Sequence, residues 1–309
     1  MADSLRVAVV VLNWNGGNRN LVCLEHLEAA RVDGMVVWFV DNGSVDGSAD
    51  LVEEAFSSVR IIRNLENLGF CGGSNVGIEA ALAEGAEWVL LLNNDVYVDQ
   101  EFLPPLLEAG RLDGQVGAIG PKVLLATEPD KIWAAGGSVA WRQNVTRLLG
   151  HMRLDDGTYE GTTEVDYVPG CAVMLRADAL RQVGVLDPSY FLYMEDVDLG
   201  VRLNRAGWKN LYVGSGRVYH EMSKSTGGGY STVRKYANAV NSVHFLRLYG
   251  GPRAWAGFLF FDVLGLGWAW LREVLMGRNP RGARMKARGI LDGLRGRRVT
   301  REVVEALLG

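Results

Sequence analysis

The chain has 309 residues, 48% of them hydrophobic, which is enough for one large α/β domain or for a catalytic domain with a smaller appendage. Its formal net charge is -4, so the composition gives no support for a nucleic-acid partner. The three cysteines, Cys23, Cys71 and Cys171, show neither zinc-site spacing nor the even number of a disulfide scaffold, which favours a reducing cytoplasm.

The first third of the chain alternates between two kinds of segment. Four short apolar runs are predicted to be strands buried on both faces: residues 7–12, 35–40, 59–62 and 88–92. Three segments between them carry apolar residues at helical spacing: residues 21–30, 49–56 and 75–83. This alternation predicts an α/β fold with a single Rossmann-like, mainly parallel sheet and helices on both faces.

Polar residues follow each of the four apolar runs. The candidates among them are Asn13, Asn15, Asp41, Asn67, Asn94 and Asp95. Parallel strands end at the same edge of a sheet, and open α/β sheets bind ligands beyond that edge. We therefore expect the active site there.

Three of these segments have both a structural and a functional interpretation. Asn93-Asn94-Asp95 is a good turn sequence, but its oxygens also suit Mg²⁺ or Mn²⁺. Asp41 begins a capped turn, and it can also accept hydrogen bonds from a ribose or base. Residues 67–75, with Gly69 and Gly73, form a predicted glycine-rich loop that leads into a helix and lacks Walker or dinucleotide spacing.

The second third of the chain is less regular. Residues 116–140 are predicted to be short strands broken by glycines, and residues 142–161 an irregular region over the site. Glu195 and Asp196 open a predicted helix, where acidic residues are ordinary, but one of them could act as a general base. Asp198 and Arg202 have ion-pair spacing. His220 follows the last predicted strand and is either structural or a metal ligand.

The segment from residue 251 to residue 309 differs in composition from the rest. It is apolar and aromatic up to residue 275 and then basic: Arg278, Arg281, Arg284, Lys286, Arg288, Arg295, Arg297, Arg298 and Arg301. We expect an interfacial helix that binds anionic headgroups through residues 255–301, rather than a transmembrane helix, because Asp262 and several glycines interrupt the apolar run. The alternative is a helical appendage packed on the core or on a second copy in a homodimer.

Several motifs together resemble the family 2 glycosyltransferases of the GT-A fold, most closely the bacterial rhamnosyltransferase-like members. The motifs are, in order, VVLNWNG, FVDNGSVDGS, NLGFCGGSNVGI, LLNNDV, VPGCAVMLRADAL, GVLDPSYFLYMEDVDLGVRLNRAGW and VYH. The resemblance runs from about Val7 to His220. It implies a catalytic domain over residues 1–250, with a donor half to about residue 115 and an acceptor half from about residue 116.

The resemblance also implies roles for individual residues. Donor-binding residues would be Asn13, Asn15, Asp41, Asn67, Gly69, Gly73, Asn94 and Asp95, with Asp41 at the base or ribose. Asp95 and His220 would bind Mg²⁺ or Mn²⁺ at the diphosphate, and Asp196, preceded by Glu195, would be the general base. Gly170, Cys171 and Trp208 would shape the acceptor side. Many members have Asp-x-Asp where this chain has Asn93-Asn94-Asp95, which leaves one fewer carboxylate for the metal.

The expected activity is inverting transfer of a sugar, with rhamnose as a candidate, from a nucleoside diphosphate sugar to a saccharide or polyprenyl-linked acceptor in cell-surface polysaccharide synthesis. We expect it in the cytoplasm, peripheral to the inner face of the cell membrane. Two alternatives are a non-catalytic nucleotide-sugar-binding subunit of a membrane complex and a nucleotidyltransferase. The intact Glu195-Asp196 pair argues against the first, and the absence of a lysine near Asn15-Gly16-Gly17 argues against the second.

Overall fold

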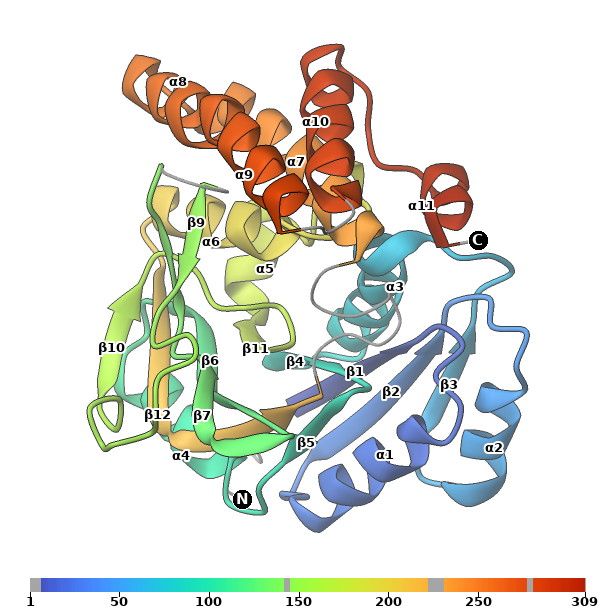
Figure 1. Cartoon of the computed structure of the whole chain (residues 1–309). Coiled ribbons are helices and arrows are strands. Elements are labelled where there is room, and N and C mark those ends of the chain that lie inside the picture. Colours follow the sequence, from blue (N-terminus) through green and yellow to red (C-terminus); the bar gives the residue numbers. More distant parts are fainter. Residues whose placement is uncertain (1–6, 142–144, 222–230, 277–279, 309) are drawn as a thin grey trace.

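A computed structural model describes residues 7–141, 145–221, 231–276 and 280–308. Within these residues a ten-stranded sheet runs through the molecule in the order β10-β12-β6-β11-β4-β1-β2-β3, with β5 beside β12 and β7 beside β6. Helices lie on both faces of the sheet, and a group of C-terminal helices forms a layer on one side of it (Figure 1). The predicted α/β class is confirmed.

The N-terminal part of the chain, the predicted donor half, is a parallel block of four strands. They are β1 (Val7–Asn13), β2 (Met35–Asp41), β3 (Arg60–Arg63) and β4 (Trp88–Asn93). The connecting helices are α1 (Arg19–Ala29), α2 (Ser48–Ala55) and α3 (Gly69–Ala83). Successive side chains of β1 pack in two different hydrophobic clusters. Val9 packs in a cluster with Leu24 and Val52, whereas Val10 packs with Ile78 of α3. A strand covered on both faces must be apolar throughout, which explains the continuous runs of β1, β2 and β4. The prediction of burial on both faces is wrong for β3, which lies at the edge of the sheet with Arg60 and Arg63 exposed.

The acceptor half adds antiparallel strands to this block. Strand β11 (Ala172–Arg176) runs antiparallel to both β4 and β6 (Val116–Leu125), and β12 (Lys209–His220) runs parallel to β6. The short β5 (Val96–Val98) pairs antiparallel with the end of β12, so that His220 lies opposite Val96. This pairing brings the end of β12 beside the turn that follows β4. Helix α4 (Leu103–Leu112) packs on β6 and β12.

The middle segment is more ordered than the sequence suggested. Residues 116–125 form the single buried strand β6, because Gly117 and Gly120 admit Trp208 and Val168 against the backbone. The following strands are β7 (Glu128–Ala134), β8 (Gly137–Val139), β9 (Thr146–Leu148) and β10 (Thr162–Val165). The fully buried Lys122 pairs with Asp155 and Glu160 and so ties the irregular 150–161 segment to β6.

The remaining helices surround the acceptor half. They are α5 (Ala177–Val183), η1 (Pro188–Tyr190), α6 (Glu195–Arg205), α7 (Thr232–Tyr249), α8 (Pro252–Phe258), η2 (Leu259–Leu264), α9 (Gly265–Leu275), α10 (Arg281–Leu294) and α11 (Arg301–Leu308). Helix α10 packs on α7 through Gly289 and Gly293, where a Cβ would meet the α7 backbone or side chains. Arg278 of the predicted basic segment lies outside the described residues.

Candidate active site

The polar clusters that follow β1, β2 and β4 meet at one edge of the sheet, as predicted. The register pairs Asn13 with Asp41 and Leu12 with Asn93. The Asn13 side chain is fully buried, and its Nδ2 donates to Asp41 Oδ1 at 3.0 Å and to two serine hydroxyls. Its Oδ1 accepts from Gly16 N, Asn20 Nδ2 and Asn94 Nδ2. Asn13 therefore joins the ends of β1, β2 and β4 in one hydrogen-bond network.

A cleft of about 320 Å³ opens beside this network. Six of the predicted donor and catalytic residues line it: Asn67, Gly69, Asn94, Asp95, Glu195 and Asp196. Asn13, Asp41 and Gly73 lie behind its wall, and Asn15 is exposed and holds the residue 44–45 turn through Ser44 and Val45. Asn42, which the sequence interpretation did not single out, lines the cleft and hydrogen-bonds Asn67.

The predicted glycine-rich loop is largely helical. Helix α3 begins at Gly69, whose positive φ of +76° suits glycine and whose missing Cβ leaves room for Phe191. A Cβ on Gly73 would lie 2.6 Å from Leu12 Cδ1 and 2.9 Å from the Asn42 side chain. The prediction of a loop up to residue 75 is therefore wrong. Gly73 allows α3 to pack closely on the end of β1 and on the residue after β2, and Gly69 makes room for Phe191. A loop was inferred because glycine disfavours helices in isolation.

Asp95 and His220 form the part of the cleft best suited to a cation. Asp95 Oδ1 lies 3.3 Å from His220 Nε2, and both side chains are buried. Neither Oδ1 nor either ring nitrogen has a well-aligned hydrogen-bond partner among the described residues. Burial alone would raise the pKa of Asp95, but the His220 ring and Arg19 hold it below its usual value. An ionised carboxylate and an imidazole with no other partner are an appropriate ligand pair for Mn²⁺ or Mg²⁺.

The described residues contain no group of three or more His, Cys, Asp or Glu side chains arranged to hold a metal ion. A cation at Asp95 and His220 would therefore need oxygen ligands from a bound diphosphate or from water. Asn94, the middle residue of Asn93-Asn94-Asp95, donates its Nδ2 hydrogens to Asn20 Oδ1 at 2.7 Å and to Asn13 Oδ1. The asparagine thus belongs to the strand-end network.

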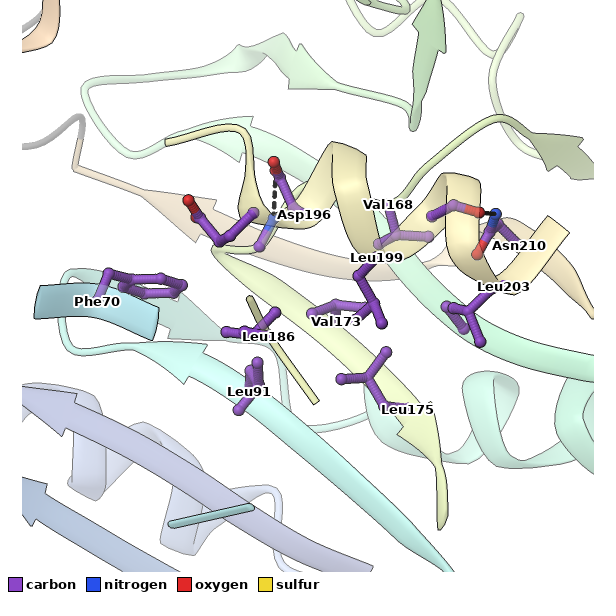
Figure 2. A pocket seen from close by; sticks show the side chains of 14 residues that line it. Phe70, Leu91, Val168, Val173, Leu175, Leu186, Asp196, Leu199, Leu203 and Asn210 are labelled. Carbon is purple, nitrogen blue, oxygen red and sulfur yellow. Dashed lines mark hydrogen bonds between the residues drawn. The ribbon is translucent and has the colours of Figure 1, made fainter. Parts of the chain in front are cut away.

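Glu195 and Asp196 begin α6 on the opposite wall of the cleft. Asp196 accepts hydrogen bonds from Gly170 N at 3.0 Å and from Val197 N at 2.8 Å. Figure 2 shows it above the apolar side chains Leu186 and Leu199. Burial raises the pKa of both carboxyls, and the charge of Asp196 raises that of Glu195 further. The two backbone amides favour ionised Asp196, so Asp196 is the better proton acceptor of the pair.

The backbone that leads to these carboxylates is strained. Phe191, Tyr193 and Met194 all have positive φ, at 60°, 67° and 75°. Nδ2 of the fully buried Asn241 on α7 lies 2.9 Å from each of three carbonyl oxygens in this segment, those of Tyr190, Leu192 and Tyr193. Non-glycine residues in this region cost of order 1–3 kcal/mol each and persist only where their surroundings hold them. Asn241 supplies part of that restraint.

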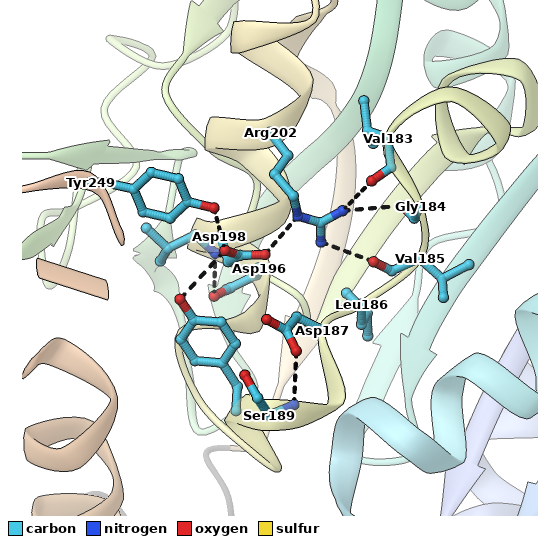
Figure 3. A network of polar contacts seen from close by, with 12 residues as sticks. Val183, Gly184, Val185, Leu186, Asp187, Ser189, Asp196, Asp198, Arg202 and Tyr249 are labelled. Atoms are coloured by element: carbon cyan, nitrogen blue, oxygen red, sulfur yellow. Dashed lines mark hydrogen bonds and ion pairs between the residues drawn. The ribbon is translucent and has the colours of Figure 1, made fainter. Parts of the chain in front are cut away.

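A second polar network fixes the body of α6 (Figure 3). Asp198 and Arg202 form the predicted ion pair, with Nε to Oδ2 at 2.7 Å. Tyr249 donates to Asp198 at 2.6 Å, and Arg202 also donates to the carbonyls of residues 183–185. The network connects α6 to the end of α7 and to the loop after α5. It therefore fixes the direction in which the start of α6 points into the cleft.

The predicted acceptor residues are only partly brought together. Gly170 and Cys171 line the cleft, and burial raises the pKa of the Cys171 thiol, so this cysteine is a packing group. Trp208 lies beyond the other end of the 11-residue α6, about 16 Å along the axis from Glu195, and donates to Gln182. Its predicted place on the acceptor side is therefore corrected: it packs against Gly117 of β6.

Sequence reasoning also missed part of the cleft wall. The additional lining residues include Trp133, Tyr193, Arg234, Asn238 and Val304. Trp133 meets His220 edge to face, with ring centroids 4.8 Å apart. Val304 belongs to α11, so the cleft includes a residue from beyond the predicted domain boundary at residue 250. None of these positions has a local signal, because each is brought to the cleft by tertiary packing.

Comparison with known sequences agrees with this geometry. The sequence model described as glycosyltransferase-like family 2 matches residues 5–237. The chain belongs to this family. It is similar to an N-acetylglucosaminyl-diphospho-decaprenol L-rhamnosyltransferase of Mycobacterium tuberculosis, with 32% identity over 246 residues, 71% of this chain and 77% of that protein. It is also similar to a galactofuranosyltransferase of Mycolicibacterium smegmatis, with 29% identity over 54% of this chain and 55% of that protein.

Solved glycosyltransferase structures share the fold. GalNAc-T7 with UDP, GalNAc and Mn²⁺ aligns with a TM-score of 0.64 and 15% identity, over 84% of this chain and 50% of that one. A mannosyltransferase from Pyrobaculum calidifontis in complex with GDP-Man and Mn²⁺ aligns with a TM-score of 0.56 and 15% identity, over 93% and 80% of the two chains. The predicted GT-A fold is confirmed. This family 2 glycosyltransferase thus carries its buried acidic residues on two facing walls of one cleft.

Proposed function

We propose that this enzyme is an inverting, metal-dependent glycosyltransferase that transfers a sugar from a nucleoside diphosphate donor to a hydroxyl of a lipid-linked saccharide. The observation that carries the proposal is the convergence of Asp95 and His220 from one wall with Asp196 from the other. A transferase of this kind needs a site for a diphosphate and a base for the acceptor, on opposite sides of the reacting carbon.

The donor would lie along the strand-end wall. Asn42 and Asn67 offer amide groups there, and behind them Asn13 and Asp41 hold the wall in place. Arg234 from α7 also lines the cleft and is a suitable cation for a diphosphate. Asp95 and His220 would hold Mn²⁺ or Mg²⁺, which when bound stabilises the negative charge that develops on the departing diphosphate.

Asp196 would take the proton from the acceptor hydroxyl as its oxygen attacks the anomeric carbon. The new bond forms on the face opposite the departing diphosphate, which inverts the configuration. The amides of Gly170 and Val197 hold the Asp196 carboxylate in one orientation, and its burial raises its basicity. Glu195 is the less exposed of the two, and because burial and the charge of Asp196 both raise its pKa, it would be the protonated partner.

The candidate sugar and acceptor follow from the relatives. The similar mycobacterial protein is named as a rhamnosyltransferase that acts on N-acetylglucosaminyl-diphospho-decaprenol. We therefore propose rhamnose as the first sugar to test and a polyprenyl-diphosphate-linked saccharide as the first acceptor. The reaction would belong to cell-surface polysaccharide synthesis at the cytoplasmic face of the membrane.

A panel of nucleotide sugars with Mn²⁺ tests the proposal. Thermal shift should identify the donor, because a ligand specific for the folded state stabilises it. Turnover with that donor should release free nucleoside diphosphate, stop on addition of EDTA and give a product of inverted anomeric configuration. Release of pyrophosphate would indicate a nucleotidyltransferase. Donor binding without turnover on any saccharide or lipid-linked acceptor would indicate a binding subunit.

A further inference from the structure

The helix formed by α8, η2 and α9 exposes more apolar surface than a helix packed on its own protein normally does. None of the α9 side chains that the structure describes is buried. Phe260, Leu264, Trp268, Leu271 and Leu275 follow one another at spacings of four or three residues and are all exposed. Leu264, Trp268 and Leu275 are 68%, 69% and 76% exposed. Such spacing puts them along one face of the helix, as a continuous apolar stripe.

The residues 252–272 are long and apolar enough to cross a membrane by length and composition. Their packing argues for a different arrangement. Asp262 in the middle of this segment is buried and pairs with Lys286 of α10 at 2.6 Å, and α9 also packs on α10. Because α10 is itself packed on α7, these contacts hold the apolar helix along the surface of the enzyme (Figure 1). One face of this helix thus contacts the rest of the protein, and the apolar stripe on another face is exposed to solvent.

Exposed basic side chains lie on α10 and on the apolar helix itself. Arg281, Arg284 and Arg288 share one face of α10 by their spacing and are exposed. Arg281 and Arg284 are the outward pair, because Arg288 also lies over the Tyr236 ring of α7, 5.6 Å from its centroid, and pairs with Asp292. Arg253 and Arg272 on the apolar helix are also exposed. An exposed apolar and aromatic stripe with exposed arginines on the same helix and on α10 matches the interface of an anionic bilayer, where rings and aliphatic chains enter the acyl boundary and cations meet the phosphates.

The apolar helix is physically continuous with the cleft. Gly257 of α8 lies against the backbone carbonyl of Trp141, and the Trp141 ring is 5.8 Å from that of Phe245 on α7. Trp141 lies between β8 and β9, and β9 supplies Thr146 and Leu148 to the cleft wall. A molecule anchored in the membrane next to the stripe would therefore reach the cleft along β8 and β9.

We propose that the stripe Phe260–Leu275 and the outward arginines of α10 dock this enzyme peripherally on an anionic bilayer, and that the β8–β9 side of the cleft receives an acceptor headgroup from that bilayer. The second part rests on the proposed function, because it assumes a lipid-linked acceptor. The first part does not depend on catalysis.

Vesicle co-sedimentation of the full chain tests the docking. The wild type should bind vesicles of phosphatidylglycerol and phosphatidylcholine and bind phosphatidylcholine alone much less. Leu264→Ser with Trp268→Ser should weaken partitioning at least about tenfold. Arg281→Ala with Arg284→Ala should weaken it by about fivefold per residue on anionic vesicles only. Leu112→Ser, an equally exposed leucine on α4, is the matched control and should bind as the wild type does.

Two further measurements are needed. One decides whether a bilayer or a second copy of the chain covers the stripe, and the other distinguishes a failure of the docking from a failure of the proposed function. Gel filtration with light scattering should show a monomer. A dimer that the Leu264→Ser and Trp268→Ser variant dissociates would assign the stripe to a second copy and overturn the docking. Unchanged vesicle binding by that variant would also overturn it. The same variant should keep its turnover on a water-soluble acceptor analogue and lose it on a vesicle-embedded acceptor. Inactivity of the wild type on both would count against the proposed function and leave the vesicle result standing.

Discussion

The two walls of the cleft are built on different principles. On the donor wall the side chains of Asn13, Asn20 and Asn94 bond to one another and to the adjacent strand ends. On the opposite wall Glu195 retains a buried oxygen without a partner among the described residues. Three of the residues that precede it, Phe191, Tyr193 and Met194, have positive φ. The first wall is held mainly by side-chain hydrogen bonds, although Oδ1 of Asp95 and the ring nitrogens of His220 on it have no well-aligned partners among the described residues. The second wall depends on a strained backbone that neighbouring residues restrain.

Asp196→Asn tests the chemical side of this comparison most directly. The amide cannot accept the acceptor proton, so turnover should fall about 10²–10⁴-fold. The single side-chain oxygen of asparagine can accept from Gly170 N or Val197 N but not from both, so the free energy of unfolding should fall by about 1–3 kcal/mol. Initial rates of nucleoside diphosphate release and urea unfolding measure the two effects, with calorimetric donor titration as the check that the variant still binds the donor. Near-normal turnover would remove Asp196 from the base role.

Asp95→Ala should weaken donor binding in the presence of Mn²⁺ by about a hundredfold, because it removes the only carboxylate proposed to hold the cation. The difference from the wild type should vanish in EDTA, where neither protein has a cation to lose. Calorimetric titration of the donor with and without Mn²⁺ gives both numbers. An equal loss with and without the metal would assign Asp95 to direct contact with the donor.

Asn13→Ala should destabilise the fold at the donor wall. Several buried partners would lose their hydrogen bonds at once, and the expected loss in the free energy of unfolding is about 3 kcal/mol. Urea unfolding followed by circular dichroism measures it. Asn18→Ala is the control, since Asn18 is exposed and caps α1 with no side-chain hydrogen bond. A stable Asn13→Ala protein with lost activity would mean that the two walls do not differ as described.

Asn241→Ala should have the smallest effect, about a tenfold fall in kcat with donor affinity unchanged. The residue touches none of the proposed ligands and acts by holding the carbonyls that position Glu195 and Asp196. A kcat and KM comparison is the readout that separates positioning from general destabilisation. Ser242→Ala, the neighbouring buried residue on α7, serves as the control. Equal losses in both variants would indicate a packing effect only.

Much of the donor half was predictable from the sequence. Strands buried on both faces leave continuous apolar runs, and parallel strands necessarily end at one edge, so the meeting of Asn13 and Asp41 followed from pattern alone. The start of α3 was misplaced because glycines that permit close helix packing cannot be told from loop glycines in a single sequence.

The other contacts of the site were predictable only through the family resemblance. The pairing of β5 with β12 places His220 beside Asp95, and no local spacing encodes that contact. Asn241 lies in an ordinary helical segment, and its role depends on a loop about fifty residues earlier in the chain. The error at Trp208 has the same origin, since the direction of α6 decides which of its ends faces the cleft.

Helix α11 has a practical consequence for protein engineering. Arg301 pairs with Glu66 at 3.0 Å, next to Asn67, and Val304 forms part of the cleft wall. Exchanging the C-terminal helices between related enzymes to alter their targeting would therefore also change the donor side. A working chimera should transfer residues 301–308 together with the matching 64–67 loop, or keep both from the same parent.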